Sequence, residues 1–197
     1  MEIKNSKYCS LEGKFLIASP NISDPRFAKT LIYMISDNVD GSMGIIVNKL
    51  ALNLDFKNFF NIITDHHLTK KTEYPIHYGG PVDFDRGFIL HSDDYTSKEE
   101  RTLLKNNLVL SSNRRILEDL SLGKGPSKFL VVTGYSGWSS QQLSRELKQN
   151  SWLIANANKK ILFSKNYKLK WINALKTIGL NEENIDSFRF SNYSGSA

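Results

Sequence analysis

The feature that most constrains this chain is a sharp turn followed by a short apolar run. Gly79-Gly80-Pro81 combines two residues that tolerate unusual backbone angles with one that fixes φ. After two acids and Arg86 comes Phe88-Ile89-Leu90, which is too short for a helix and typical of a buried strand. The sequence therefore predicts strands over 75–78 and 87–91, on either side of a tight turn.

The same stretch suggests an anion site. Arg86 lies at the entrance of the second strand, close in sequence to Gly79 and Gly80. Because glycine has no side chain, a ligand can approach the backbone N–H groups of these two residues closely. A guanidinium and exposed backbone amides both favour carboxylate or phosphate. The alternative is a plain turn in which Arg86 pairs with Asp83 or Asp85.

Composition indicates one folded domain. A chain of 197 residues with 40% hydrophobic and 11% aromatic residues can bury a sizeable core. The single cysteine, Cys9, cannot form an internal disulfide, which fits a reducing compartment and excludes a thiolate-rich metal site. No apolar run approaches the ~18 residues of a membrane span, and the start of the chain lacks the features of a signal peptide. We expect a polar segment over 1–10, a single domain over 11–197, and a cytoplasmic location.

Positive charge is concentrated near the C-terminus. The net charge is +6, and six lysines without any acid lie between Lys159 and Lys176. Phosphate backbones attract such clusters, so Lys165, Lys168 and Lys170 are candidate nucleic-acid contacts. The alternative is a bias in composition alone, because the whole chain is rich in lysine, asparagine and isoleucine.

Catalytic and metal-binding motifs are incomplete. Ser136 follows a predicted strand, but its surroundings break the G-x-S-x-G pattern of a nucleophile elbow, and all four histidines precede it. An enzyme acting on a small acidic metabolite would have only Asp24, His77, His91 and Arg86 to use. Neither a P-loop nor G-x-G-x-x-G is present, and no histidine spacing indicates a metal. We therefore expect no catalytic residues, no metal and no cofactor.

Apolar patterns and turn residues predict the remaining elements. Further strands are expected over 11–18, 30–35, 44–47, 103–110 with a break at 106–107, 129–132, 152–155 and 161–163. Helices are expected from Asn53 or Asp55 to 63, from Ser111 or Ser112 to 122, from Ser139 to 147 and from 167 to 178. Ser139 and Gln142 have the spacing of a capping box. A polar connection over 64–73 carries His66 and His67. Strands that arrive mostly as hairpins, with helices between them, indicate an α+β fold. Its sheet should be largely antiparallel or mixed, free to curl toward a barrel, and flanked by helices.

Besides the stretch over 78–91, the chain contains the spaced motifs Gly13–Pro20, Asp24–Phe27 and Gly41–Asn48 and the turn Gly134–Trp138. Together these motifs resemble the bacterial YqgE/AlgH family, from about Leu11 to the C-terminus. The family has no agreed biochemical activity, although some members are labelled transcriptional regulators. The resemblance also implies that its recurring motifs gather around one cleft, which adds Asp24 and Asn48 to the candidate anion pocket.

The most economical interpretation is a non-enzymatic ligand-binding or regulatory protein of this family. The protein would hold a small anion near Arg86, Gly79, Gly80, Asp24 and Asn48, or it would act on a protein partner. The first alternative is a nucleic-acid-binding regulator that uses the lysine-rich segment, and the second is an enzyme. The sequence leaves the oligomeric state open.

Overall fold

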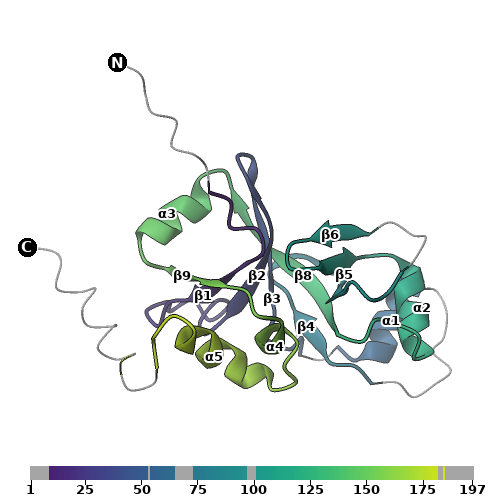
Figure 1. The fold of residues 1–197 in the computed structure, drawn as a ribbon. Helices are drawn as coiled ribbons and strands as arrows, with labels where there is room; N and C mark the ends of the chain where they lie inside the picture. Colours follow the sequence, from purple (N-terminus) through teal and green to yellow (C-terminus); the bar gives the residue numbers. More distant parts are fainter. Residues whose placement is uncertain (1–8, 53, 65–72, 97–100, 182–183, 185–197) are drawn as a thin grey trace, which may run out of the picture.

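The computed structural model describes residues 9–52, 54–64, 73–96, 101–181 and 184 (Figure 1). Its strands are β1 (Lys14–Ala18), β2 (Leu31–Asn38), β3 (Gly41–Ile46), β4 (Ile76–Tyr78), β5 (Val82–Ser92), β6 (Thr102–Leu104), β7 (Leu108–Ser111), β8 (Phe129–Ser139) and β9 (Trp152–Asn156). Its helices are α1 (Phe56–Thr64), α2 (Arg114–Ser121), α3 (Gln142–Lys148), α4 (Lys159–Leu162), the 3₁₀ turn η1 (Tyr167–Leu169) and α5 (Lys170–Lys176).

The strands form one curled sheet in the order β6-β7-β5-β8-β3-β2-β1-β9, with β4 placed beside β8 (Figure 1). Strand pairs in the described chain are antiparallel except β4 and β8, which run parallel with Ile76 opposite Val131. The long strand β8 joins the two halves, because its first part pairs with β5 and its end pairs with β3. The predicted α+β class, with a mixed and largely antiparallel sheet flanked by helices, is therefore confirmed.

Helices cover the sheet in three places, and each place has its own apolar cluster. One cluster packs α5 against β1 and β2, the second packs α1 and α2 against β5 and β8, and the third packs α3 against β1, β2 and β3. Their centres are fully enclosed, as Tyr33, Ile116 and Leu16 show. Each such side chain contributes roughly 1.5–3 kcal/mol by burial.

Helix boundaries follow local capping chemistry. The carboxylate of Asp55 accepts a hydrogen bond of 2.7 Å from the Asn58 N–H at the start of α1, as one of the two predicted caps. At α2 the cap is Asn113 rather than Ser111 or Ser112, since its Oδ1 accepts from the Ile116 N–H. Ser111 instead ends β7 and is buried.

Three further local predictions are wrong. The run 161–163 is not a strand but belongs to α4 and its end, because Asn158 caps the segment through the Lys160 N–H and a run of three apolar residues fits either structure. Gly134–Trp138 is not a turn but the continuation of β8. The helix expected from Ser139 begins at Gln142, and only half of the capping box forms, with the Ser139 N–H donating to Gln142 Oε1.

Parts of the sequence interpretation fall outside the described residues. These are nearly all of the polar segment 1–10 and most of the connection 64–73, with His66 and His67. Within the described chain, no helix has both the length and the apolar character needed to cross a membrane.

Candidate functional site

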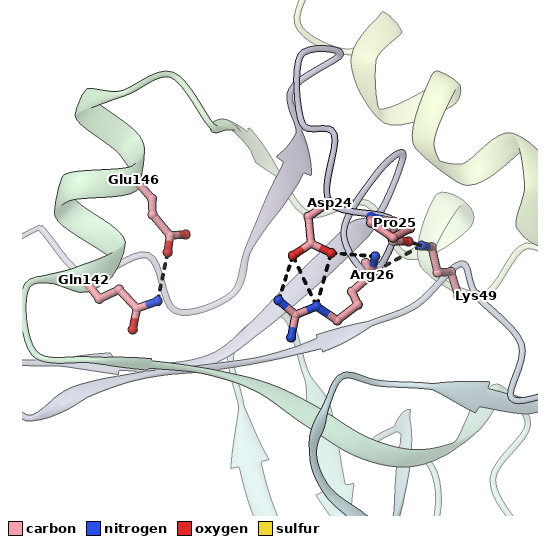
Figure 2. A network of polar contacts seen from close by, with 6 residues as sticks. All are labelled: Asp24, Pro25, Arg26, Lys49, Gln142 and Glu146. Carbon is pink, nitrogen blue, oxygen red and sulfur yellow. Dashed lines mark hydrogen bonds and ion pairs between the residues drawn. The ribbon is translucent and has the colours of Figure 1, made fainter.

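The first predicted site residue, Asp24, is engaged within its own loop. Its carboxylate accepts from the guanidinium of Arg26 at 2.7 Å and 3.1 Å, and this bonding holds the pKa of Asp24 below its usual value. The ammonium of Lys49 donates to the carbonyl oxygens of Pro25 and Arg26 (Figure 2). The loop is thereby fixed to the chain that follows β3.

Tyr78 is where the recurring motifs meet. Its N–H donates to the Lys49 carbonyl at 3.0 Å, and its ring packs against Phe84 with centroids 6.0 Å apart. Burial raises the pKa of Tyr78, and the nearby charge of Arg26 opposes that rise. The structure thus gathers the segments around Asp24, Lys49 and Tyr78.

The polar groups of Asn48 and Gly79 are used inside the fold. Asn48 Oδ1 accepts from the Leu31 N–H at 2.7 Å, and Asn48 Nδ2 donates to the Lys29 carbonyl at 2.9 Å. The Gly79 N–H donates to the Thr133 carbonyl at 2.9 Å. These groups hold strands together, so they are not directed at a ligand.

Gly80 serves close packing rather than ligand access. Its φ is +151°, and a Cβ placed on it would lie 2.2 Å from the carbonyl carbon of Tyr135. On the facing strand, Gly134 has φ +67°, and its Cβ would lie 2.6 Å from the Gly80 carbonyl oxygen. Only two glycines allow these backbones to approach so closely.

Arg86 lies over the ring of a neighbouring residue on β5. Its guanidinium carbon lies 5.2 Å from the ring centroid of Phe88, which packs in a different apolar cluster from Tyr78. Among the described residues it forms no ion pair, so the structure does not show the alternative pairing with Asp83 or Asp85. Asp24, Asn48 and Gly79 therefore bond within the fold, while Arg86 lies over the ring of Phe88, and the anion pocket at these residues stays a prediction.

His77 and His91 do not approach each other across paired strands. His77 on β4 lies opposite Val132 of β8, whereas His91 on β5 lies opposite Phe129 of the same strand. With β8 between them, β4 and β5 are roughly 10 Å apart. The described residues contain no group of three side chains able to hold a metal ion.

Each of these histidines has its own buried partners. His77 Nδ1 lies 3.3 Å from the Val131 carbonyl, and burial together with the charge of Lys170 lowers the pKa of His77 to about 4. His91 Nε2 lies 3.0 Å from Ser111 Oγ, and burial lowers its pKa as well. Both imidazoles are therefore neutral at pH 7.

A different site is visible in the structure: a cleft of about 840 Å³ between the α4–η1 segment and the first residues of β4 and β8. Figure 1 shows α4 next to β4 at this place. Four lysines line it, against one acid, Glu73. These lysines are Lys128, Lys159, Lys160 and Lys165. We call this site the basic cleft.

Four half-buried aromatic side chains form the apolar part of the basic cleft. They are Tyr74, Phe129, Phe163 and Tyr167. Tyr74 is held in place by an edge-to-face contact with Phe129 at 4.9 Å and by the bond from its hydroxyl to the Leu120 carbonyl. The cleft therefore combines positive charge with fixed aromatic surface.

The predicted nucleic-acid contact at Lys170 is wrong. Its side chain is fully buried, and its ammonium donates to the carbonyl oxygens of Val47 and Leu162. Burial lowers the pKa of Lys170 to about 8. An enclosed ammonium cannot reach a phosphate backbone, whereas Lys165 and Lys168 are exposed and Lys165 lines the basic cleft.

The sequence indicated one wall of the basic cleft but not the opposite wall. The lysine-rich run contains Lys159, Lys160 and Lys165, but nothing in it indicates the opposite wall. That wall comes from Tyr74 and Phe129, which are distant in sequence and carry no local motif. The only signal was the predicted strand at 129–132.

Comparison with known proteins places the chain in one family. The model of the family described as AlgH-like matches residues 15–183. A protein of Rickettsia canadensis named a UPF0301 protein is 42% identical over 189 residues, which cover 95% of this chain and 96% of that protein. A UPF0301 protein of Rickettsia felis is likewise 42% identical, with the same coverage.

Solved structures agree. The solution structure of the AlgH protein from Pseudomonas aeruginosa has a TM-score of 0.76 and 31% identity, covering 100% of this chain and 98% of that one. A protein from Corynebacterium diphtheriae shares the fold, with a TM-score of 0.67, 17% identity and 89% of each chain covered. The chain therefore belongs to the AlgH-like family.

Proposed function

We propose that this protein is a non-enzymatic binding protein whose basic cleft takes a small anionic ligand with a flat aromatic part. The observation that carries the proposal is the meeting of four lysines and four half-buried aromatic side chains in one cleft. A regulatory role would follow from the occupancy of this cleft.

The chemistry of the lining selects the ligand class. Ammonium groups attract phosphate or carboxylate, and aromatic side chains stack on flat rings. The volume of about 840 Å³ lies within the range of small-molecule sites. A nucleotide has both a phosphate and a flat base, so it is the first class to test. Positive charge dominates the lining, which also includes Glu73 and His77, and this excess of cations suits the binding of an anion.

The test is the binding of AMP, ATP and pyrophosphate, measured by thermal shift and by calorimetry. At a hundred times its dissociation constant a ligand stabilises by ~2.7 kcal/mol, which raises Tm by roughly 5–11 °C for a domain of this size. Lys160→Gln with Lys165→Gln should weaken nucleotide binding about tenfold or more, which corresponds to ~1.4 kcal/mol. Lys124→Gln, an exposed lysine outside the cleft, is the matched control.

The outcomes separate the cleft from the pocket first predicted at Arg86. A shift that the double lysine variant loses and Arg86→Ala keeps supports the basic cleft. The opposite pattern returns the site to Arg86. Equal shifts in the double lysine variant and in Lys124→Gln overturn the cleft proposal, and so does the absence of any shift with these three probes.

A second candidate function is binding of single-stranded nucleic acid. The observation in its favour is that Lys165 and Tyr167 line the cleft and that Lys168, the residue after Tyr167, is exposed. Such binding would weaken as salt rises, with a log–log slope of roughly −0.7 for each phosphate contacted. Lys168→Gln should reduce that slope but leave nucleotide affinity unchanged. Affinity for an oligonucleotide that does not change with salt would contradict this function.

A further inference from the structure

Strand β9 is the last strand of the sheet, and its outer edge has no partner within the described chain. The Ser19 N–H donates to the Ser151 carbonyl at 3.0 Å, which makes these two residues a hydrogen-bonded pair. Because such pairs alternate in an antiparallel ladder, Leu153 and Ala155 bond to β1. The N–H and C=O groups of Trp152, Ile154 and Asn156 therefore point outward.

The β9 edge lacks the features that usually prevent strand pairing. Native edges are protected by charges, prolines or short length. The other edge, β6, has only three residues and lies between Arg101 and Lys105. By contrast, β9 has five residues, none of which is charged or proline. This difference indicates that the β9 edge is suited to accept a strand.

Two hollows flank this edge, and Ile154 lines both of them. The first, of about 640 Å³, is bounded by Leu143 and Leu147 of α3. The second, of about 420 Å³, is bounded by Thr177 and Ile178 beyond α5. Side chains of an added strand would alternate between the two faces. The residue opposite Ile154 would enter the first, mainly apolar hollow.

Exposed cations lie on or next to the helices that bound these hollows. Arg145 and Lys148 lie exposed in the last turn of α3, and Lys176 precedes the residues that bound the second hollow. The carboxylate that lines the first hollow, Asp37, accepts from the Leu11 N–H and from Ser42 Oγ. A second copy of this basic chain would bring like charges together, whereas an acidic segment would be attracted.

We propose that the β9 edge is a docking site for an extended segment of a partner protein, which adds a strand to the sheet. The segment carries an apolar residue opposite Ile154 and acidic residues on either side of it. Main-chain hydrogen bonds to Trp152, Ile154 and Asn156 hold the segment, and the first hollow selects its central side chain. This surface is independent of the basic cleft.

The probe is a capped peptide of about nine residues that alternates isoleucine and glutamate, enough to span the edge at ~3.3 Å per residue. Amide hydrogen exchange of the full chain is measured with and without it. Binding should slow exchange at Trp152, Ile154 and Asn156 at least tenfold. Exchange at Leu153 and Ala155 should change little, because β1 already accepts their N–H groups.

Two controls isolate the backbone contacts. Ile154→Pro removes the outward N–H without touching the bonds to β1, a position at which an edge strand tolerates proline, and it should weaken peptide binding at least tenfold. Ile154→Val keeps the N–H and should bind nearly normally. A peptide N-methylated at alternate residues should not bind.

Other results overturn the proposal. These are equal binding of the N-methylated peptide, binding unaffected by Ile154→Pro in a variant with unchanged near-ultraviolet circular dichroism, or no protection at the three outward amides. If the outward amides of the peptide-free protein became more protected as the protein concentration rose, the edge would be assigned to a second copy of the chain. Protection that is already present at every concentration would assign it to another part of the same chain.

Discussion

The ammonium of Lys170 donates a hydrogen bond of 2.6 Å to the carbonyl oxygen of Leu162, the last residue of α4. A second bond of 2.8 Å reaches the Val47 carbonyl, just beyond the end of β3. A single enclosed side chain on α5 thus ties one wall of the basic cleft to the sheet. The lysine that the sequence suggested as a phosphate contact is a structural tie instead.

Replacing this lysine should loosen that wall. Lys170→Met keeps most of the apolar stem but leaves two buried carbonyl groups without their donor, which should lower the free energy of unfolding by about 1–3 kcal/mol. Urea unfolding at pH 7 measures the loss. Lys168→Met, an exposed neighbour, should change stability by less than about 0.5 kcal/mol. Similar values for the two variants would mean that the bonds of Lys170 are not needed to hold α4.

Local sequence patterns predicted the local structure of this fold. The hairpin of β2 and β3 followed from β-branched residues around a polar turn, and Gly123 and Gly179 ended helices with φ of +71° and +82°. Pairing between strands that are distant in sequence was harder to predict. The strands on either side of Gly79-Gly80-Pro81 do not pair with each other, because β8 lies between them. No local pattern specifies such an insertion.

The site was harder to predict than the fold for the same reason. Glycines and Arg86 indicated an anion pocket, since exposed amides and a guanidinium suit an anion. The structure uses the Gly79 N–H in the ladder with Thr133, which sequence alone could not show. Conversely, the lysine run indicated positive charge, but Tyr74 and Phe129 complete the basic cleft only through tertiary packing.

Two glycines with nearly the same backbone angle test whether close packing or φ decides the cost of a side chain. Gly134 has φ +67° with a backbone oxygen 2.6 Å from an added Cβ, whereas Gly123 has φ +71° and open space. Gly123→Ala should cost about 1–2 kcal/mol for the left-handed angle alone. Gly134→Ala should cost clearly more, or prevent folding, because backbone must move. Thermal unfolding of both variants measures this, and equal costs would contradict the packing role.

Asn48 should prove structural rather than ligand-binding. Asn48→Ala leaves the Leu31 N–H and the Lys29 carbonyl without their partner, so the free energy of unfolding should fall by roughly 2–4 kcal/mol. Asn21→Ala, at an exposed position, should have little effect. Chemical unfolding gives the stability, and calorimetry gives the nucleotide affinity, which should stay unchanged. A stable Asn48→Ala protein with lost ligand affinity would instead support the pocket predicted from sequence.

His77 should make the protein sensitive to mild acid. Burial lowers its pKa to about 4 in the folded state, while the unfolded chain has the ordinary value near 6.5. Between these values the unfolded state binds more protons than the folded state. The stability that depends on a neutral His77 is therefore fully present above about pH 6.5 and is lost as pH falls toward 4. The loss at the lower end should reach about 3 kcal/mol.

The measurement is the urea midpoint at several values between pH 7 and pH 4.5, compared between the natural chain and His77→Gln. Glutamine can still donate to the Val131 carbonyl but does not titrate, so the variant should lose less stability on acidification. Some pH dependence should persist, because burial also lowers the pKa of His91 and acts in the same direction. If the two proteins lost stability in parallel over this range, a neutral, buried His77 would not be the cause of the acid sensitivity.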